Sequence, residues 1–270
     1  MSAAFVAVDI GNTAVKVAWF GDERLSPHRL PVPTAQFELP AVGGDLQLDA
    51  LPFASIAAAH PAAPWFVSSV NRSACDRLAA WRADALPSAP WRVLDYRVLP
   101  LTVDVDFPDR VGLDRLATSC AADWLRAPDR DAIVVDAGTA LKIHVIRADG
   151  VFVGGAILPG LRLSSESLHV RTDLLPRVGV STADQQPPVV GRNTEAAIRS
   201  GIYWGAVGAV REIVTRMRAE CRSEPQVFIT GGDAAGLAAL IDHDTRFVPG
   251  LGLAGIAVAV HRLGLLDAAP

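Results

Sequence analysis

Apolar residues fall into short runs and helical repeats that alternate along the chain. The first clear run, 5–8, is rich in β-favouring residues and ends at Asp9. A turn at 11–13 follows, and a second β-favouring run spans 15–20. This order of apolar run, turn residues and apolar run predicts a β-hairpin.

A closely related hairpin is predicted half a chain later. The phrase VDIGNTAVKVAW at 8–19 is matched by VDAGTALKIHVI at 135–146, with one residue fewer in the turn. Asp136 stands where Asp9 stands in the first phrase. The repetition indicates a chain built from two related halves.

Strands and helices alternate elsewhere too, which favours an α/β fold. Residues 27–64 are Pro-rich and weakly patterned, and 181–191 form a polar loop. We expect two related domains, 1–125 and 126–270, each with a mixed sheet flanked by helices. The expected strands are 65–70, 154–160 and 227–230, and the expected helices are 71–85, 112–124, 194–219, 251–265 and one carrying Leu161, Leu163, Leu168 and Leu174.

The amino-acid composition and net charge argue against some classes of binding partner. Half of the 270 residues are hydrophobic, a fifth are charged, and the net charge is −4. This balance provides no broad cationic field, so we expect neither nucleic-acid nor membrane binding. The three cysteines are far apart, and the N-terminus has no basic region of a signal peptide. We therefore expect a cytoplasmic protein.

The basic residues are distributed unevenly between arginine and lysine. Of 25 basic residues only two are lysines, Lys16 and Lys142, and they occupy equivalent places in the two related phrases. Lysine carries a compact point charge, whereas arginine is a planar fork. The bias predicts a role that guanidinium cannot fill, although common ancestry of the two phrases would also place the lysines there.

The residues of the first phrase suit a phosphate and a metal ion. Glycine lets the backbone approach a ligand, and exposed amides at 11–13 can cradle phosphate oxygens. Asp9, at the end of a buried strand, is placed to hold hydrated magnesium. The alternative is a tight hairpin with its usual turn residues.

Together the motifs resemble those of type III pantothenate kinases, in the acetate and sugar kinase, chaperone and actin superfamily. The resemblance covers nearly the whole chain. It rests on DIGNTAVK (9–16), GLDR (112–115), DAGTA (136–140), GGAILPG (154–160), LHVRTDLLP (168–176), GRNTEAAIRSG (191–201), TGGD (230–233) and VPGLGLAGI (248–256).

The resemblance implies two actin-like domains with an ATP cleft between them. It also implies phosphorylation of pantothenate by ATP, the first step of coenzyme A synthesis, in a homodimer. It implies Asp114 as the general base, Asp136 as ligand of a monovalent cation (K⁺ or NH₄⁺), and Mg²⁺ near Asp9. The implied ATP-binding residues are Asp9, Ile10, Gly11, Asn12, Thr13, Ala14, Val15, Lys16, Thr139, Gly231 and Gly232. The implied substrate-binding positions are Val105, Gly112, Leu113, Asp114, Arg115 and Thr194, the last reaching in from a second subunit. We expect the dimer contact on the helix at 196–210, where Gly201, Gly205 and Gly208 thin one side.

Each of these residues also has a purely structural interpretation. Asp114 would favour the positive end of a helix, Arg115 could form a surface ion pair, and Thr194 would cap the helix that follows it. TGGD would be only a turn at the end of a strand. His144 and His169 lie in apolar patterns, which favours core or rim positions over a catalytic role.

The chain departs from the family pattern at several positions. Val105 and Phe107 replace a tyrosine and an asparagine, Asp173 is unusual, and Lys142 replaces a threonine. The Lys142 ammonium would either replace the monovalent cation beside Asp136 or add charge to the phosphate site. The departures leave two rivals, a nucleotide-binding regulatory relative and a kinase for another small hydroxy compound. Retention of Asp114 and both hairpins favours the pantothenate kinase.

Overall fold

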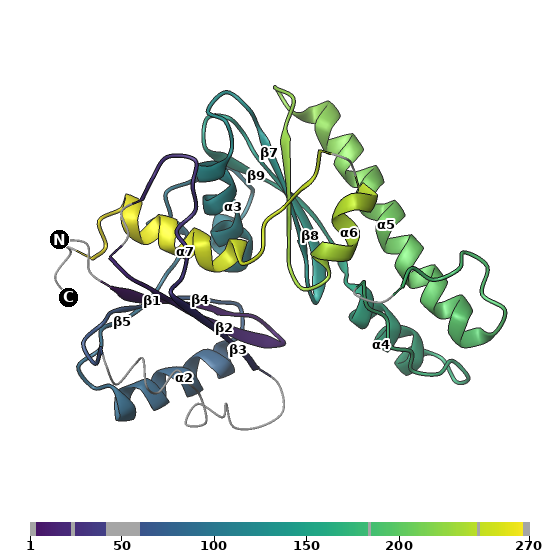
Figure 1. Cartoon of the computed structure of the whole chain (residues 1–270), viewed down its shortest axis with the longest axis horizontal. Helices are drawn as coiled ribbons and strands as arrows, with labels where there is room; N and C mark the ends of the chain where they lie inside the picture. Colours follow the sequence, from purple (N-terminus) through teal and green to yellow (C-terminus); the bar gives the residue numbers. More distant parts are fainter. Residues whose placement is uncertain (1–3, 23–24, 42–59, 183–184, 242–243, 267–270) are drawn as a thin grey trace. The chain divides into compact units, whose positions relative to one another are not determined.

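The computed structural model describes residues 4–22, 25–41, 60–182, 185–241 and 244–266 (Figure 1). The chain forms two compact units. The first comprises residues 1–125 together with 251–270, and the second comprises residues 126–250.

The first unit is built on a mixed sheet with the strand order β3-β2-β1-β4-β5. Strand β1 pairs antiparallel with β2 and parallel with β4. The strands are β1 (Phe5–Ile10), β2 (Ala14–Phe20), β3 (Ala35–Pro40), β4 (Trp65–Ser69) and β5 (Trp91–Val93). Between β5 and the next helix lie η2 (Tyr96–Val98), β6 (Thr102–Val103) and η3 (Pro108–Arg110).

Helices cover both faces of this sheet (Figure 1). Helix α2 (Arg72–Ala85) packs on the face that carries Val6 and Val8. Helices α3 (Leu113–Leu125) and α7 (Leu251–Arg262) lie on the opposite face. There the Phe5 ring lies 5.5 Å from that of His261 in α7. Both faces of the sheet are therefore buried. This agrees with the near-continuous apolar runs of its central strands, because strands buried on both faces are apolar at nearly every position.

The five strands of the second unit repeat this plan in the order β11-β10-β7-β8-β9. Helices α4, α5 and α6 pack against the face that carries Ile133, Val135 and Ile143. The strands are β7 (Ala132–Ala137), β8 (Ala140–Ile146), β9 (Val151–Pro159), β10 (Gln226–Thr230) and β11 (Arg246–Phe247). The helices are α4 (Leu161–Arg171), α5 (Thr194–Glu220) and α6 (Ala234–Ile241).

The five strands β3-β2-β1-β4-β5 correspond in order to β9-β8-β7-β10-β11. In both sheets, a hairpin is joined by a parallel strand beside its first member. The first strands of the two hairpins have the same sequence of buried and half-buried positions. The expected α/β fold of two related domains with mixed sheets flanked by helices is therefore confirmed.

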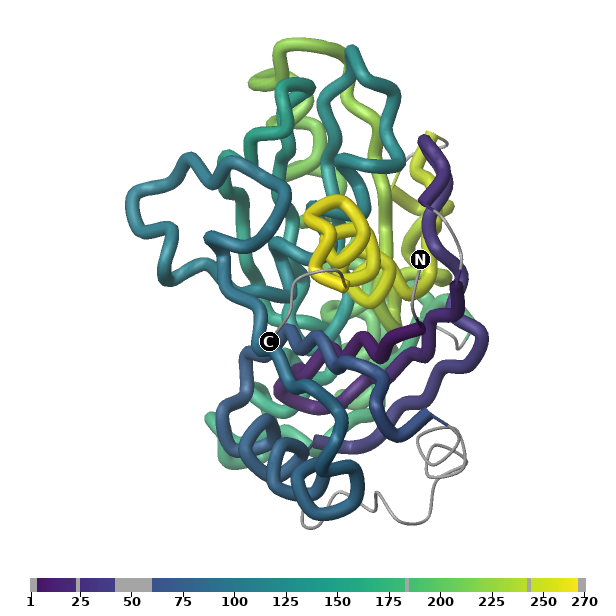
Figure 2. The backbone as a smooth tube through the Cα atoms, turned by 90° about the vertical axis from the view of Figure 1, so that its left-hand side faces the viewer, coloured from purple at the N-terminus to yellow at the C-terminus, as the bar shows by residue number. Residues whose placement is uncertain are grey.

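The last helix is arranged differently from the sequence-based expectation, which gave residues 251–270 to the second domain. Helix α7 packs on α3 in the first unit, and Figure 2 shows it in yellow beside the purple strands β1 and β2. A Cβ added at Gly255 would lie 1.7 Å from the carbonyl oxygen of Ala117. Glycine at this position permits the close approach of the two helices.

Several short elements were not expected. Strand β3 lies in the Pro-rich stretch, and α6 and β11 follow the TGGD turn. Leu174 was expected on the helix at 161–174, but α4 ends at Arg171 and Leu174 is 87% exposed. Part of the Pro-rich stretch, 42–59, lies outside the described residues.

Candidate active site

The first hairpin places polar side chains in a row across neighbouring strands. Asp9 of β1 is in register with Lys16 of β2 on one side and with Ser68 of β4 on the other. Residues in register on neighbouring strands point to the same face of a sheet. The carboxylate, the ammonium and the hydroxyl therefore project from one face at the end of β1.

The carboxylate of Asp9 also lies at the N-terminal end of helix α7. A Cβ added at Gly252, the second residue of α7, would lie 3.1 Å from Asp9 Oδ2. The positive end of a helix stabilises a negative charge. Sequence reasoning missed Ser68 and Gly252 as neighbours of Asp9, because both contacts are non-local.

The turn of the first hairpin is held by its own backbone. The Gly11 N–H donates to the Ala14 carbonyl at 2.9 Å, and the Ala41 N–H donates to the Thr13 carbonyl at 2.9 Å. Asn12, at the tip, is exposed. The turn is thus fixed while its tip stays accessible to a ligand.

The second hairpin repeats the row with one additional contact. Asp136 of β7 is in register with Lys142 of β8 and with Thr230 of β10. The Lys142 Nζ lies 2.6 Å from Asp136 Oδ2, and the two side chains are only 16% and 15% exposed. They form a largely buried ion pair.

Gly160 supports the turn of the second hairpin. Its N–H donates to the Thr139 carbonyl at 3.0 Å. A Cβ at Gly160 would lie 2.2 Å from the Gly138 carbonyl oxygen. Only glycine fits at the end of GGAILPG, and its contact fixes the backbone that carries Thr139.

The residues around Asp136 do not fit a free monovalent cation. The Lys142 ammonium already contacts Oδ2. At an effective dielectric constant of about 20, a second unit charge 4 Å from the ammonium would be repelled by about 4 kcal/mol. Within the described ranges, no group of three or more His, Cys, Asp or Glu residues could hold a metal ion.

The GLDR motif forms the start of α3. Asp114 is in the first helical turn, and its Oδ1 accepts a hydrogen bond from the Arg115 N–H at 2.8 Å. A Cβ at Gly112 would lie 2.5 Å from this same oxygen. Glycine at 112 therefore leaves the space that the carboxylate occupies.

Arg115 is half-buried beside this carboxylate. Burial lowers the pKa of the guanidinium, and the charge of Asp114 partly offsets that effect. Arginine remains charged at neutral pH even when buried. The first turn of α3 thus presents a carboxylate next to a fixed positive charge.

The two glycines of TGGD differ in their surroundings. Gly231 has φ +104°, and a Cβ there would lie 2.3 Å from the Ala137 carbonyl oxygen. A Cβ at Gly232 would meet no described atom within 4 Å. Gly231 is required by the backbone, whereas Gly232 leaves open space beside the strand end.

Two positions that depart from the family pattern, Val105 and Phe107, lie in the segment before α3. Phe107 is 57% exposed, and the Arg110 guanidinium lies over its ring at 4.6 Å. Val105 is half-buried in the same segment.

The N-cap of α5 is Asn193, whose side chain accepts a hydrogen bond from the Ala196 N–H at 2.8 Å. The interpretation of Thr194 as the helix cap is therefore wrong, and Thr194 is an exposed first helical residue.

His144 and His169, the two histidines considered above, lie in the core and at the surface of the second unit. His144 is fully buried in β8 and its ring lies 5.6 Å from that of Phe152. His169 is exposed, with Nδ1 2.9 Å from the Leu175 carbonyl. Neither is close in sequence to Asp114, and the core-or-rim interpretation describes both.

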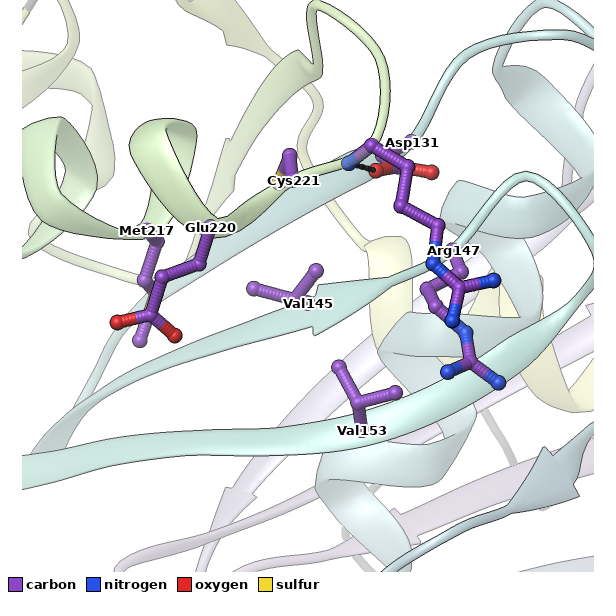
Figure 3. Close-up of a pocket in the computed structure, with 8 residues that line it drawn as sticks. Asp131, Val145, Arg147, Val153, Met217, Glu220 and Cys221 are labelled. Carbon is purple, nitrogen blue, oxygen red and sulfur yellow. Dashed lines mark hydrogen bonds between the residues drawn. The ribbon is translucent and has the colours of Figure 1, made fainter.

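A pocket of about 250 Å³ opens beside the C-terminal end of α5 (Figure 3). It contains none of the predicted site residues. The carboxylate of Asp131 in its wall accepts hydrogen bonds from the N–H groups of Ala148 and Arg222, both at 2.7 Å. Arg147 pairs with Asp149. The side chains of Asp131 and Arg147 in this pocket are therefore engaged in contacts with neighbouring loops.

The fold of the chain is similar to that of solved structures. It resembles a glucokinase from an Antarctic psychrotroph, with a TM-score of 0.51 and 10% identity over 97% of this chain and 100% of that one. It also resembles the activator of 2-hydroxyisocaproyl-CoA dehydratase from Clostridium difficile, with a TM-score of 0.50 and 11% identity over 99% and 98% of the two chains. These similarities show that the chain has the actin-like fold.

Sequence comparison identifies the family. The family model described as type III pantothenate kinase matches residues 5–216. The type III pantothenate kinase of Chlorobium luteolum is 34% identical over 247 residues, which cover 89% of this chain and 87% of the relative. That of Dinoroseobacter shibae is 45% identical over 134 residues, half of each chain. The chain belongs to the type III pantothenate kinase family.

No helix among the described residues is both long and apolar enough to span a membrane.

Proposed function

We propose that this protein transfers the γ-phosphoryl group of ATP to the primary hydroxyl of pantothenate, giving 4'-phosphopantothenate, the first step of coenzyme A synthesis. The observation that carries the proposal is the start of α3, where GLDR places the Asp114 carboxylate against Gly112 and beside the half-buried guanidinium of Arg115. Membership in the family supports the substrate.

Asp114 is the proposed general base. The hydrogen bond from the Arg115 N–H fixes the orientation of its carboxylate. A general base of this kind acts as a carboxylate within hydrogen-bond reach of the hydroxyl whose proton it accepts. Phosphoryl transfer depends chiefly on alignment and charge neutralisation, so no covalent intermediate is required.

ATP and a divalent metal ion are the co-reactants of this kinase family. We propose that Asp9 holds Mg²⁺ through water, and that the turn Gly11–Thr13 and Lys16 contact the phosphates. Magnesium keeps several waters and needs only one or two carboxylates, which suits the lone carboxylate of Asp9. The flanking Ile10, Ala14 and Val15 would contribute backbone groups. Thr139 and the glycines Gly231 and Gly232 are the proposed contacts to the rest of the nucleotide.

Pantothenate is the proposed ligand of Gly112, Leu113, Asp114 and Arg115. Val105 would line the acceptor site without the hydroxyl of the usual tyrosine. The exposed position of Thr194 at the start of α5 supports a contact with substrate from a second subunit. A cytoplasmic location stays a prediction from the sequence.

A homodimer is part of this proposal. On the exposed face of α5, a Cβ at Gly201, Gly205 or Gly208 would meet no described atom within 4 Å. Such a face permits the close approach of another helix. The face supports a contact with the same helix of a second copy.

The test is ATP consumption with pantothenate as acceptor, compared between the wild type and Asp114→Asn. The proposal predicts activity that is lost in the variant while ATP still binds. Activity only with other small hydroxy compounds would identify a different acceptor. Absence of activity in both proteins, with ATP binding retained, would indicate a regulatory relative.

A further inference from the structure

We propose that the Lys142 ammonium is a built-in cation that compensates Asp136, so that the enzyme works without a free monovalent cation at this carboxylate. The inference rests on the proposed kinase function. It concerns how the charge of Asp136 in the second hairpin is compensated. The experiment below can fail without contradicting the kinase function.

The geometry of the pair is fixed by the sheet. Strand β7 lies between β10 and β8, and β8 lies between β7 and β9, so neither strand is at the edge of the sheet. Asp136 and Lys142 are directly in register, with Nζ 2.6 Å from Oδ2. Both side chains are about 85% buried, since their exposed fractions are 15% and 16%.

A buried carboxylate at this position needs a compensating charge. Removing one partner of a buried ion pair leaves an uncompensated charge in a poorly solvated place, which is strongly unfavourable. Lys142 supplies that charge from within the chain. A lysine ammonium resembles free ammonium in size and donors, whereas a planar guanidinium does not. This explains why lysine persists here in a chain whose other basic residues, apart from Lys16, are arginines.

The two hairpins differ in how their carboxylates are stabilised. Asp9 has the first turn of α7 beside its Oδ2. Asp136 has the Lys142 ammonium at the corresponding oxygen, and its Oδ1 faces the turn at Gly138, 3.7 Å from where a Cβ would lie. The pair therefore lies directly beneath the turn that carries Thr139, and it removes the net negative charge that would repel phosphate oxygens.

Two substitutions test the assignment. Lys142→Ala removes the ammonium and opens space for a free cation, whereas Lys142→Met removes the charge but fills the volume. Activity is measured in potassium, ammonium and choline chloride at equal ionic strength. We expect wild-type activity to be the same in all three salts. Lys142→Ala should lose activity in choline chloride and regain about tenfold or more in potassium or ammonium chloride, and Lys142→Met should not recover.

Thermal unfolding provides a readout independent of catalysis. A cation that binds only the folded state stabilises it by RT ln(1 + L/Kd), where L is the free cation concentration, so the unfolding temperature rises with cation concentration. Potassium should therefore raise the unfolding temperature of Lys142→Ala relative to choline, and leave that of the wild type unchanged.

Three results would overturn the inference. They are strong potassium dependence of the wild-type activity, a potassium-dependent rise in wild-type unfolding temperature, and a raised KM for ATP in Lys142→Ala that no cation corrects. The last would make Lys142 a phosphate ligand. The wild-type measurements stand even if Lys142→Ala fails to fold. A wild type that makes no product in any salt would contradict the kinase function, while the unfolding measurements would still decide the role of Lys142.

Discussion

Gly252 at the start of helix α7 lies against the carboxylate of Asp9 near the end of strand β1. A Cβ at Gly252 would lie 3.1 Å from Asp9 Oδ2 and 3.9 Å from Thr118 Cγ2. At the first distance a neighbouring group must shift slightly, whereas the second is an ordinary van der Waals contact. The last helix of the chain therefore helps to set the position of the carboxylate that we propose to hold magnesium.

Gly252→Val should displace this carboxylate without unfolding the protein. A misplacement of about 1 Å at a reacting centre costs about 100-fold in rate, so we expect kcat/KM for ATP to fall by about 10- to 100-fold. The apparent affinity for Mg²⁺, measured by titrating activity with the metal, should weaken as well. An unchanged Mg²⁺ titration would remove Asp9 from the metal site.

The glycines of TGGD form a matched pair. Gly231→Ala places a Cβ 2.3 Å from the Ala137 carbonyl oxygen at φ +104°, so it should lower the free energy of unfolding by about 1–3 kcal/mol. Gly232→Ala meets no described atom and should leave stability unchanged while raising KM for ATP several-fold. Denaturant unfolding and steady-state kinetics measure the two effects. A Gly232→Ala enzyme with wild-type KM would place the adenosine elsewhere.

Gly205→Arg should convert the proposed dimer to a monomer. The substitution adds a long charged side chain to an exposed face where a Cβ would meet no described atom within 4 Å. Sedimentation velocity measures the change in mass. Thr215→Arg, at an exposed position further along α5, is the control and should stay dimeric. Monomers in both variants and in the wild type would contradict the dimer.

Stability should fall in mild acid because of His261. Burial against Phe5 lowers the pKa of this imidazole below its ordinary value of 6.5. Below 6.5 the unfolded chain then binds more protons than the folded one, so the free energy of unfolding decreases as pH falls from about 7 through the folded-state pKa. In His261→Gln this part of the pH dependence should disappear. Denaturant unfolding between pH 7.5 and 5.5, about the range of an ordinary histidine, measures it. An equal slope in both proteins would assign the effect to other groups.

The hairpins could be predicted from the sequence because their information is local. An apolar run ending in aspartate, a glycine turn and a second apolar run determine both strands and their register. The ion pair of Asp136 and Lys142 follows from that register. Helix α2 was also predictable, because Asn71 gives a cap signal and accepts from the Ala74 N–H.

Other parts could not be predicted because their causes are non-local. Strand β3 alternates apolar and polar residues, but it is only six residues long and lies in a Pro-rich stretch, so the pattern is too short to stand out. Helix α6 is apolar nearly throughout, which hides a helical period. The packing of α7 against α3, and hence Gly252 beside Asp9, depends on contacts between distant segments. Sequence reasoning therefore found the residues of the candidate site more readily than the supports that position them.

The central claim is that Asp114 takes the proton from the pantothenate hydroxyl as ATP transfers its phosphoryl group. The most direct measurement is mass spectrometry of the product from ATP, Mg²⁺ and pantothenate, with wild type and Asp114→Asn at equal concentrations. The account predicts 4'-phosphopantothenate from the wild type and a rate at least about 100-fold lower from Asp114→Asn, with ATP binding retained. Equal product from both proteins, or none from the wild type, would contradict it.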